Sequence, residues 1–120
     1  MQSDDSLFAS TAGADWLRQF LRVRLDKASR LAKGASVERI RQLNRGASVV
    51  LSSCLSYVEK AKEKGERLNT QNLVILAENI AFKADGTDFG KGKKSAARKL
   101  RKVILWCLAT LQPAQEQVTA

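Results

Sequence analysis

Two segments of the chain concentrate positive charge in a way that suits phosphate binding. Residues 16–45 hold nine Lys or Arg against two acidic residues, and residues 91–102 hold seven against none. Seven of the first nine are arginine, whose planar guanidinium binds phosphate through two parallel hydrogen bonds and stacks on bases. We therefore predict a polyanion-binding surface, with these candidate residues: Arg18, Arg22, Arg30, Arg41, Arg45, Lys91, Lys93, Lys94, Arg98, Lys99, Arg101, Lys102 and Phe89.

The second basic segment begins in a glycine-rich run. Residues 85–92 contain three glycines, which predicts a loop on which Phe89 is exposed and able to stack on a base. A helix that starts after this loop, at Lys93 or Ser95, would present free backbone N–H groups and its positive dipole end to an anion. The cations come without a motif that reads base edges, so we expect sequence-independent binding of RNA or single-stranded DNA.

Composition argues against a catalytic role. The chain has 120 residues and no histidine, which removes the commonest general base and the Ser-His and Cys-His nucleophile pairs. The run GTDFGKGKKS departs from a phosphate-binding loop, because three residues rather than four separate its first two glycines and Gly92 stands where Ser or Thr is required. Cys54 and Cys107 each lie in an apolar run and are interpreted as core residues. We expect no enzymatic activity, no metal and no cofactor.

Apolar residues recur at spacings of three and four in four segments, which predicts four amphipathic helices packed as an all-α bundle. Gly46 lies inside the second segment, and we predict one continuous helix there despite the cost of a helical glycine. A short helical turn is predicted at residues 4–9. The four predicted helices span about 13–33, 37–65 with Ser36 as N-cap, 70–84 after Asn69 or Thr70, and 93–111 with Pro113 as the stop.

The aromatic residues on these helices are interpreted as core. Trp16, Phe20, Phe82 and Trp106 all occur within helical apolar patterns, so we expect burial rather than base stacking. The length allows one domain, which we place at residues 1–113 with a frayed tail at 114–120.

A small, helical, basic chain without a catalytic constellation resembles the small subunits of CRISPR effector complexes. The resemblance rests on size, fold class and the distribution of charge over the whole chain, and on no diagnostic motif. It implies a non-catalytic role in an antiviral ribonucleoprotein. It also implies other protein subunits as partners, several copies packed side by side, and RNA or a DNA strand along the basic face.

Two other interpretations stay open. The first is a protein-interaction adaptor or inhibitor whose basic face meets an acidic protein. The second, an amphipathic membrane-surface helix at residues 14–33, is disfavoured because its apolar stripe is needed for the bundle. The longest apolar run is too short to span a bilayer, and Asp4 and Asp5 do not fit the start of a secretory signal. We expect a cytoplasmic protein without a membrane partner.

Overall fold

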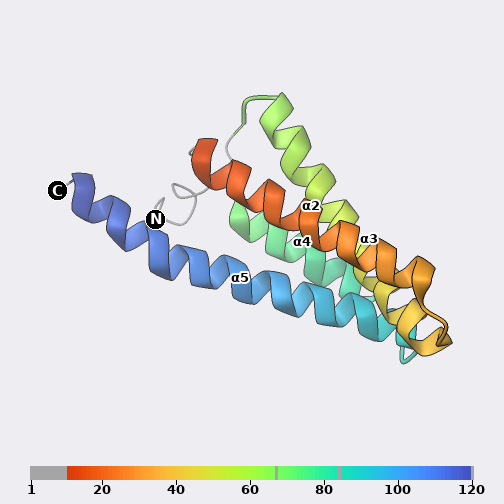
Figure 1. Ribbon diagram of the computed structural model, residues 1–120. Helices are drawn as coiled ribbons and strands as arrows, with labels where there is room; N and C mark the ends of the chain where they lie inside the picture. The colour runs from red at the N-terminus through yellow and green to blue at the C-terminus, as the bar shows by residue number, and fades with distance from the viewer. Residues whose placement is uncertain (1–10, 67, 84, 120) are drawn as a thin grey trace.

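The computed structural model describes the backbone of residues 11–66, 68–83 and 85–119, and the side chains of residues 15–66, 68–83 and 85–106. Within these residues the chain forms helices and no strand, so the predicted all-α fold is confirmed. The predicted turn at residues 4–9 lies outside the described residues. The helices are α2 (Thr11–Gly34), α3 (Glu38–Glu63), α4 (Thr70–Phe82) and α5 (Asp88–Thr119) (Figure 1).

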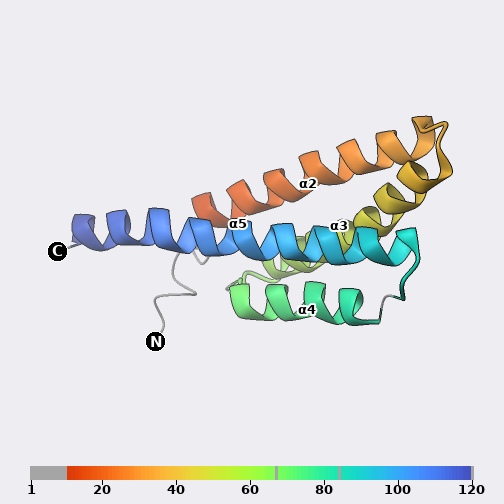
Figure 2. The same cartoon turned by 90° about the horizontal axis from the view of Figure 1, so that it is seen from below.

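Helix α3 is the centre of the arrangement, because it packs against each of the other three helices. Helix α4 also lies antiparallel beside α5 (Figures 1 and 2). By contrast, no Cα atom of α2 comes within 8 Å of a Cα atom of α5 in the described part of the chain. The largest buried apolar side chains are Leu17 and Leu21 of α2, Val50, Cys54 and Val58 of α3, Leu73 of α4, and Leu100 and Ile104 of α5.

The helix starts agree with the sequence prediction at α4 and differ from it at α3. Asn69 is the N-cap of α4, and its side-chain oxygen accepts a hydrogen bond from the backbone N–H of Asn72 at 3.0 Å. At α3 the N-cap is Val37 rather than Ser36, and no side chain caps it. The first turn is held instead by Arg41, which donates to the Glu38 carboxylate at 2.7 Å and to the carbonyl of residue 35 at 2.8 Å.

The predicted glycine-rich loop is much shorter than expected, because α5 begins at Asp88 and not at residue 93 or 95. Thr87 supplies the start signal. Its Oγ1 accepts a hydrogen bond from the backbone N–H of Gly90 at 3.1 Å, as an N-cap side chain does. Thr87 in turn donates to Asp85, and this hydrogen bonding lowers the pKa of the Asp85 carboxyl below its usual value. Gly90 and Gly92 therefore lie inside a helix.

Close packing of α3 on α5 explains why glycines occur within both helices. A Cβ atom on Gly46 of α3 would overlap the carbonyl oxygen of Phe89, and a Cβ on Gly92 of α5 would overlap the carbonyl oxygen of Leu43. The two backbones cross at these points with no room for a side chain. Helix α3 runs unbroken through Gly46, as predicted, and the glycine serves the crossing rather than a bend.

Helix α5 also ends later than predicted. Its backbone continues through Pro113 to Thr119, although proline lacks the N–H that would bond to the preceding turn. These last turns extend beyond the other helices (Figures 1 and 2). The side chains of residues 114–120 lie outside the described residues, so the frayed tail stays a prediction.

The cysteine prediction is confirmed where the structure describes it. Cys54 is fully buried, and burial raises the pKa of its thiol to about 12. The side chain of Cys107 lies outside the described residues. Among the described helices, none carries an apolar stretch long enough to cross a membrane.

Candidate functional site

A cleft of about 280 Å³ lies between α2 and α5, with α3 as its floor. It exists because α2 and α5 both pack on α3 while their backbones stay apart. Apolar side chains make up most of its wall, and they include Leu31, which is 45% exposed. The lining residues are Phe20, Arg24, Lys27, Ala28, Leu31, Asn44, Ala47, Leu51, Ser95, Ala96, Lys99 and Leu100.

The charged side chains at this cleft are all positive. Arg24 and Lys27 line the α2 wall and Lys99 lines the α5 wall, and no carboxylate is among the lining residues. None of these three cations has a carboxylate within 4 Å in the described part of the chain. The cleft therefore combines an apolar interior with cations from two helices, a combination that suits an anion carrying apolar groups.

An aromatic stack borders the α2 wall. The Trp16 and Phe20 rings lie 5.5 Å apart at an interplanar angle of 12°, and the Arg24 guanidinium lies 5.5 Å from the centre of the Phe20 ring. Stacked aromatic rings attract each other, and an arginine beside a ring adds a cation–π contact. One continuous aromatic and cationic surface thus leads from Trp16 to the cleft.

The interpretation of the aromatic residues as core is wrong for three of the four. Trp16 is 42% exposed, Trp106 57% and Phe82 86%, while Phe20 is partly buried at the cleft. Helix α2 buries only the strip that meets α3, and Trp16 lies one residue, or 100° around the helix, from the buried Leu17. Phe82 is the last residue of α4.

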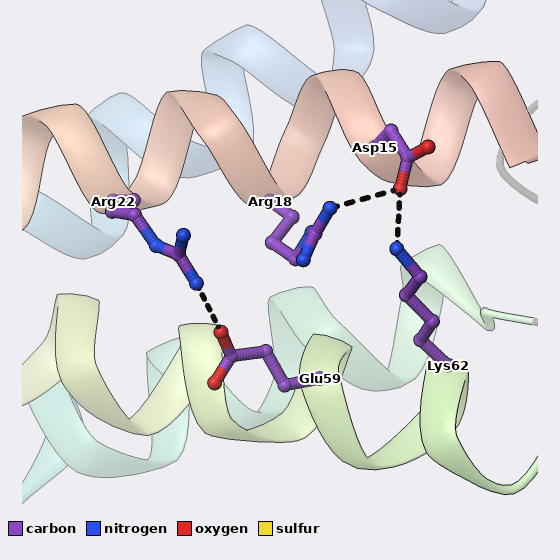
Figure 3. Close-up of polar contacts among 5 residues, drawn as sticks. All are labelled: Asp15, Arg18, Arg22, Glu59 and Lys62. Carbon is purple, nitrogen blue, oxygen red and sulfur yellow. Dashed lines mark hydrogen bonds and ion pairs between the residues drawn. The ribbon is translucent and has the colours of Figure 1, made fainter.

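Arg18 and Arg22 do not line the cleft. Their side chains lie in a polar seam between α2 and α3 (Figure 3). Arg22 donates to Glu59 at 2.7 Å, and Asp15 accepts from Arg18 at 3.3 Å and from Lys62 at 3.1 Å. The hydrogen bond from Lys62 is the main cause that holds the pKa of Asp15 below its ordinary value, and the charges of Lys62 and Arg18 add to it. Arg22 therefore joins α2 to α3, whereas Arg18 pairs with Asp15 of its own helix.

A second, more open groove brings three predicted residues together. Arg41, Arg45 and Phe89 line it with Lys33, but Arg41 is already bonded to Glu38. Phe89 is not on an exposed loop: it lies in the first turn of α5, partly buried.

The free N–H groups predicted at a helix start at Lys93 or Ser95 are not found there, because both residues lie inside α5, which begins at Asp88. The backbone N–H of Gly90 donates to Thr87 Oγ1, and that of Lys91 to the Thr87 carbonyl. The Lys93 ammonium lies 4.8 Å from the centre of the Phe89 ring. The two side chains therefore form a cation–π contact with each other.

The remaining predicted cations lie on solvent-facing surfaces. Arg101 is 3.9 Å from the Glu78 carboxylate of α4, at the limit of an ion pair. The others are exposed: Arg30 on α2, and Lys91, Lys94, Arg98 and Lys102 on α5. Of the thirteen predicted residues, Lys99 alone lines the cleft between α2 and α5.

Sequence reasoning missed the residues that matter most at the cleft, namely Trp16, Phe20, Arg24 and Lys27. A signal for them existed. Phe20, Arg24, Lys27 and Leu31 follow one another at spacings of four, three and four, which places them on one helix face. The four residues form an apolar helix face that also contains two cations. Cations within an apolar face indicate that the face is exposed to solvent rather than buried in the core.

The described residues contain no group of three acidic, cysteine or histidine side chains arranged to hold a metal ion. Comparison of the chain with protein-family models, with curated proteins and with solved structures finds no match.

Proposed function

We propose that this protein binds the backbone of RNA or single-stranded DNA in the cleft between α2 and α5, independently of sequence and without catalysis. The observation that carries the proposal is the convergence of Arg24, Lys27 and Lys99 from two helices on a cleft lined by no carboxylate. Phosphates spaced along a strand match cations spaced along a groove.

The charge of the whole molecule supports the same ligand. The formal net charge is +9, and α5 carries further exposed cations at Lys91, Arg98 and Lys102. Such a field attracts a polyanion before any contact forms. The absence of a base-reading motif from the sequence favours backbone contacts as the main source of affinity.

We further propose that the protein acts as one subunit of a larger ribonucleoprotein, such as a CRISPR effector complex. Exposed apolar side chains on α4 and α5 support a contact with other protein subunits. Ile75 is 52% exposed, Leu105 54% and Trp106 57%, and Ile75 and Leu105 line one shallow groove between these helices. Exposed apolar groups of this size, gathered in one region, are typical of interaction surfaces.

The experiment is a salt titration of binding to a labelled single strand of about twelve nucleotides. Replacing Arg24, Lys27 and Lys99 together by Gln removes about three phosphate contacts. The slope of log affinity against log salt should then flatten by about 2, because each neutralised phosphate of a single strand contributes about 0.7.

The matched control replaces Lys60, Lys64 and Lys83 by Gln. These exposed lysines line none of the described grooves, and the change in net charge is identical, so this variant should keep nearly the full slope. Equal slopes for the two variants would contradict a phosphate site in the cleft. Binding to an acidic protein but to no nucleic acid would favour the adaptor interpretation instead.

A further inference from the structure

We infer that the cleft and its aromatic border bind unpaired nucleobases, so that the protein selects single strands over duplexes. This inference rests on the proposed function and deepens it, because phosphate contacts alone do not distinguish a single strand from a duplex. The surface concerned consists of Trp16, Phe20 and Arg24 on α2, together with the apolar interior of the cleft beside Leu31, which also belongs to α2.

The stack on α2 has the geometry of a base-binding platform. Trp16, Phe20 and Arg24 follow one another every four residues, so their side chains lie about 6 Å apart along the helix axis. The two rings are nearly parallel, and the guanidinium lies beside the second. Because 42% of Trp16 is exposed at one end of this ladder, a base that stacks on it extends an existing row of flat groups.

The apolar interior of the cleft provides a second place for a base. Leu31 is 45% exposed although it lies among apolar neighbours of α3 and α5, so water covers apolar surface there. A nucleobase is flat and largely apolar on its faces, and it would displace this water while its phosphates stay near Lys27 and Lys99. In a duplex the base faces are stacked on each other, so a duplex cannot fill the floor.

The shape of the site favours a nucleic-acid strand over an anionic membrane. Arg24, Lys27 and Lys99 lie on the two walls of a cleft, and the apolar floor is formed between those walls by α3. A flat bilayer would meet the helices on either side without reaching the floor. A strand that is one nucleotide wide can lie inside it.

The decisive experiment compares an oligothymidine of about twelve nucleotides with an abasic strand of equal length and charge. Trp16→Ala should weaken binding of oligothymidine by about 5- to 150-fold, the usual range for loss of one aromatic stacking contact. The same substitution should leave the affinity for the abasic strand unchanged. Trp16→Phe, which keeps an aromatic ring, should retain most of the affinity.

Phe82→Ala is the matched control, because Phe82 is an exposed aromatic residue on α4 that lines none of the described grooves. It should bind both strands as the unchanged protein does. In a Trp106→Phe background Trp16 is the one remaining tryptophan of the two in the chain. Its fluorescence should be quenched by oligothymidine and not by the abasic strand, and circular dichroism checks that every variant stays helical.

The outcomes separate this inference from the proposed function. If Trp16→Ala binds oligothymidine unchanged while the Arg24, Lys27 and Lys99 variant loses its salt slope, base stacking is refuted and backbone binding stands. If no strand binds at all, both fail. Equal affinity for a duplex and a single strand, or a Trp16 response to phosphatidylserine vesicles without one to oligothymidine, also overturns the inference.

Discussion

Helix α2 carries cations on two faces, and the two faces use them differently. In the seam, Arg18 and Arg22 meet carboxylates of α2 and α3, as Figure 3 shows. At the cleft, Arg24 and Lys27 have no carboxylate within 4 Å in the described residues. Residues 22 and 24 differ by 200° around the helix, and this rotation separates cations that hold helices together from cations that remain available to a ligand.

The comparison also explains why local charge density is a poor guide to a binding site. Counted along the sequence, Arg18, Arg22 and Arg24 belong to one basic segment. In space the carboxylates of Asp15 and Glu59 neutralise the first two. The number of nearby acidic side chains, rather than the number of cations, distinguishes the two faces.

The largest expected effect on stability comes from disrupting the α3–α5 crossing. This crossing positions the α5 wall of the cleft, and its disruption does not involve the residues of the seam. Gly92→Ala should destabilise the protein by about 2–4 kcal/mol, because the new Cβ forces the two backbones apart. Gly34→Ala, where nothing lies within 4 Å of the new atom, should stabilise it by about 0.5–1 kcal/mol. Urea unfolding measures both, and equal midpoints for the two variants would refute the crossing.

The next largest effect concerns the salt dependence of binding, which should differ between the cleft face and the seam face of α2. Replacing Arg24 and Lys27 by Gln should reduce the salt slope for a single strand by about 1.4, since two phosphate contacts are lost. Replacing Arg18 and Arg22 by Gln changes the net charge equally and should reduce the slope by much less. Fluorescence anisotropy over a range of salt concentrations measures both slopes, and a larger effect of the seam pair would reverse the assignment of the two faces.

A smaller effect concerns the strength of the seam itself. The side chains of Arg22 and Glu59 are 50% and 37% exposed, so solvent screens their attraction. A double-mutant cycle with Arg22→Gln and Glu59→Gln should give a coupling energy below about 1 kcal/mol. A coupling of several kcal/mol in urea unfolding would mean that the seam is far less hydrated than its exposure indicates.

The smallest effect is a pH dependence at Asp15. Its pKa in the folded protein is lowered below 3.8 by the hydrogen bond from Lys62, so its charged form stabilises the fold above about pH 4. This contribution is lost as the pH falls through the folded-state pKa. The urea midpoint of the unchanged protein should exceed that of Asp15→Asn at pH 6, and the difference should shrink as the pH falls below 3.8 and Asp15 becomes protonated. A difference that grows in acid would contradict the assignment.

Hydrophobic periodicity was sufficient to predict the four helices, because each must bury an apolar strip against its neighbours. It could not assign the glycines before the last helix. Gly90 and Gly92 lie in a glycine-rich run that is typical of a loop. Glycine is required at position 92 by a tertiary contact, because the backbone of α3 passes close to Gly92. The N-cap at Thr87 was not predicted, although Thr is a favoured N-cap residue and Asp88 follows it in the first turn of α5.

The candidate site was only partly predictable, for a related reason. The sequence shows which residues share a helix face, but not how much of that face a neighbouring helix covers. Trp16 and Leu17 are adjacent and both apolar, yet α3 buries Leu17 completely and leaves Trp16 partly exposed. Likewise, the pairing of Arg22 with Glu59 joins residues 37 positions apart. No local pattern contains that information.

The position of α3 under the cleft has a consequence for cooperativity. The α2 wall and the α5 wall are each docked on α3, and their backbones are not in contact in the described residues. Small rotations of one wall on α3 are therefore transmitted to the other mainly through the core beneath. A ligand that contacts Arg24 and Lys99 together adds a direct link between the walls. Ligand binding would therefore couple the packing of α2 on α3 to the packing of α5 on α3.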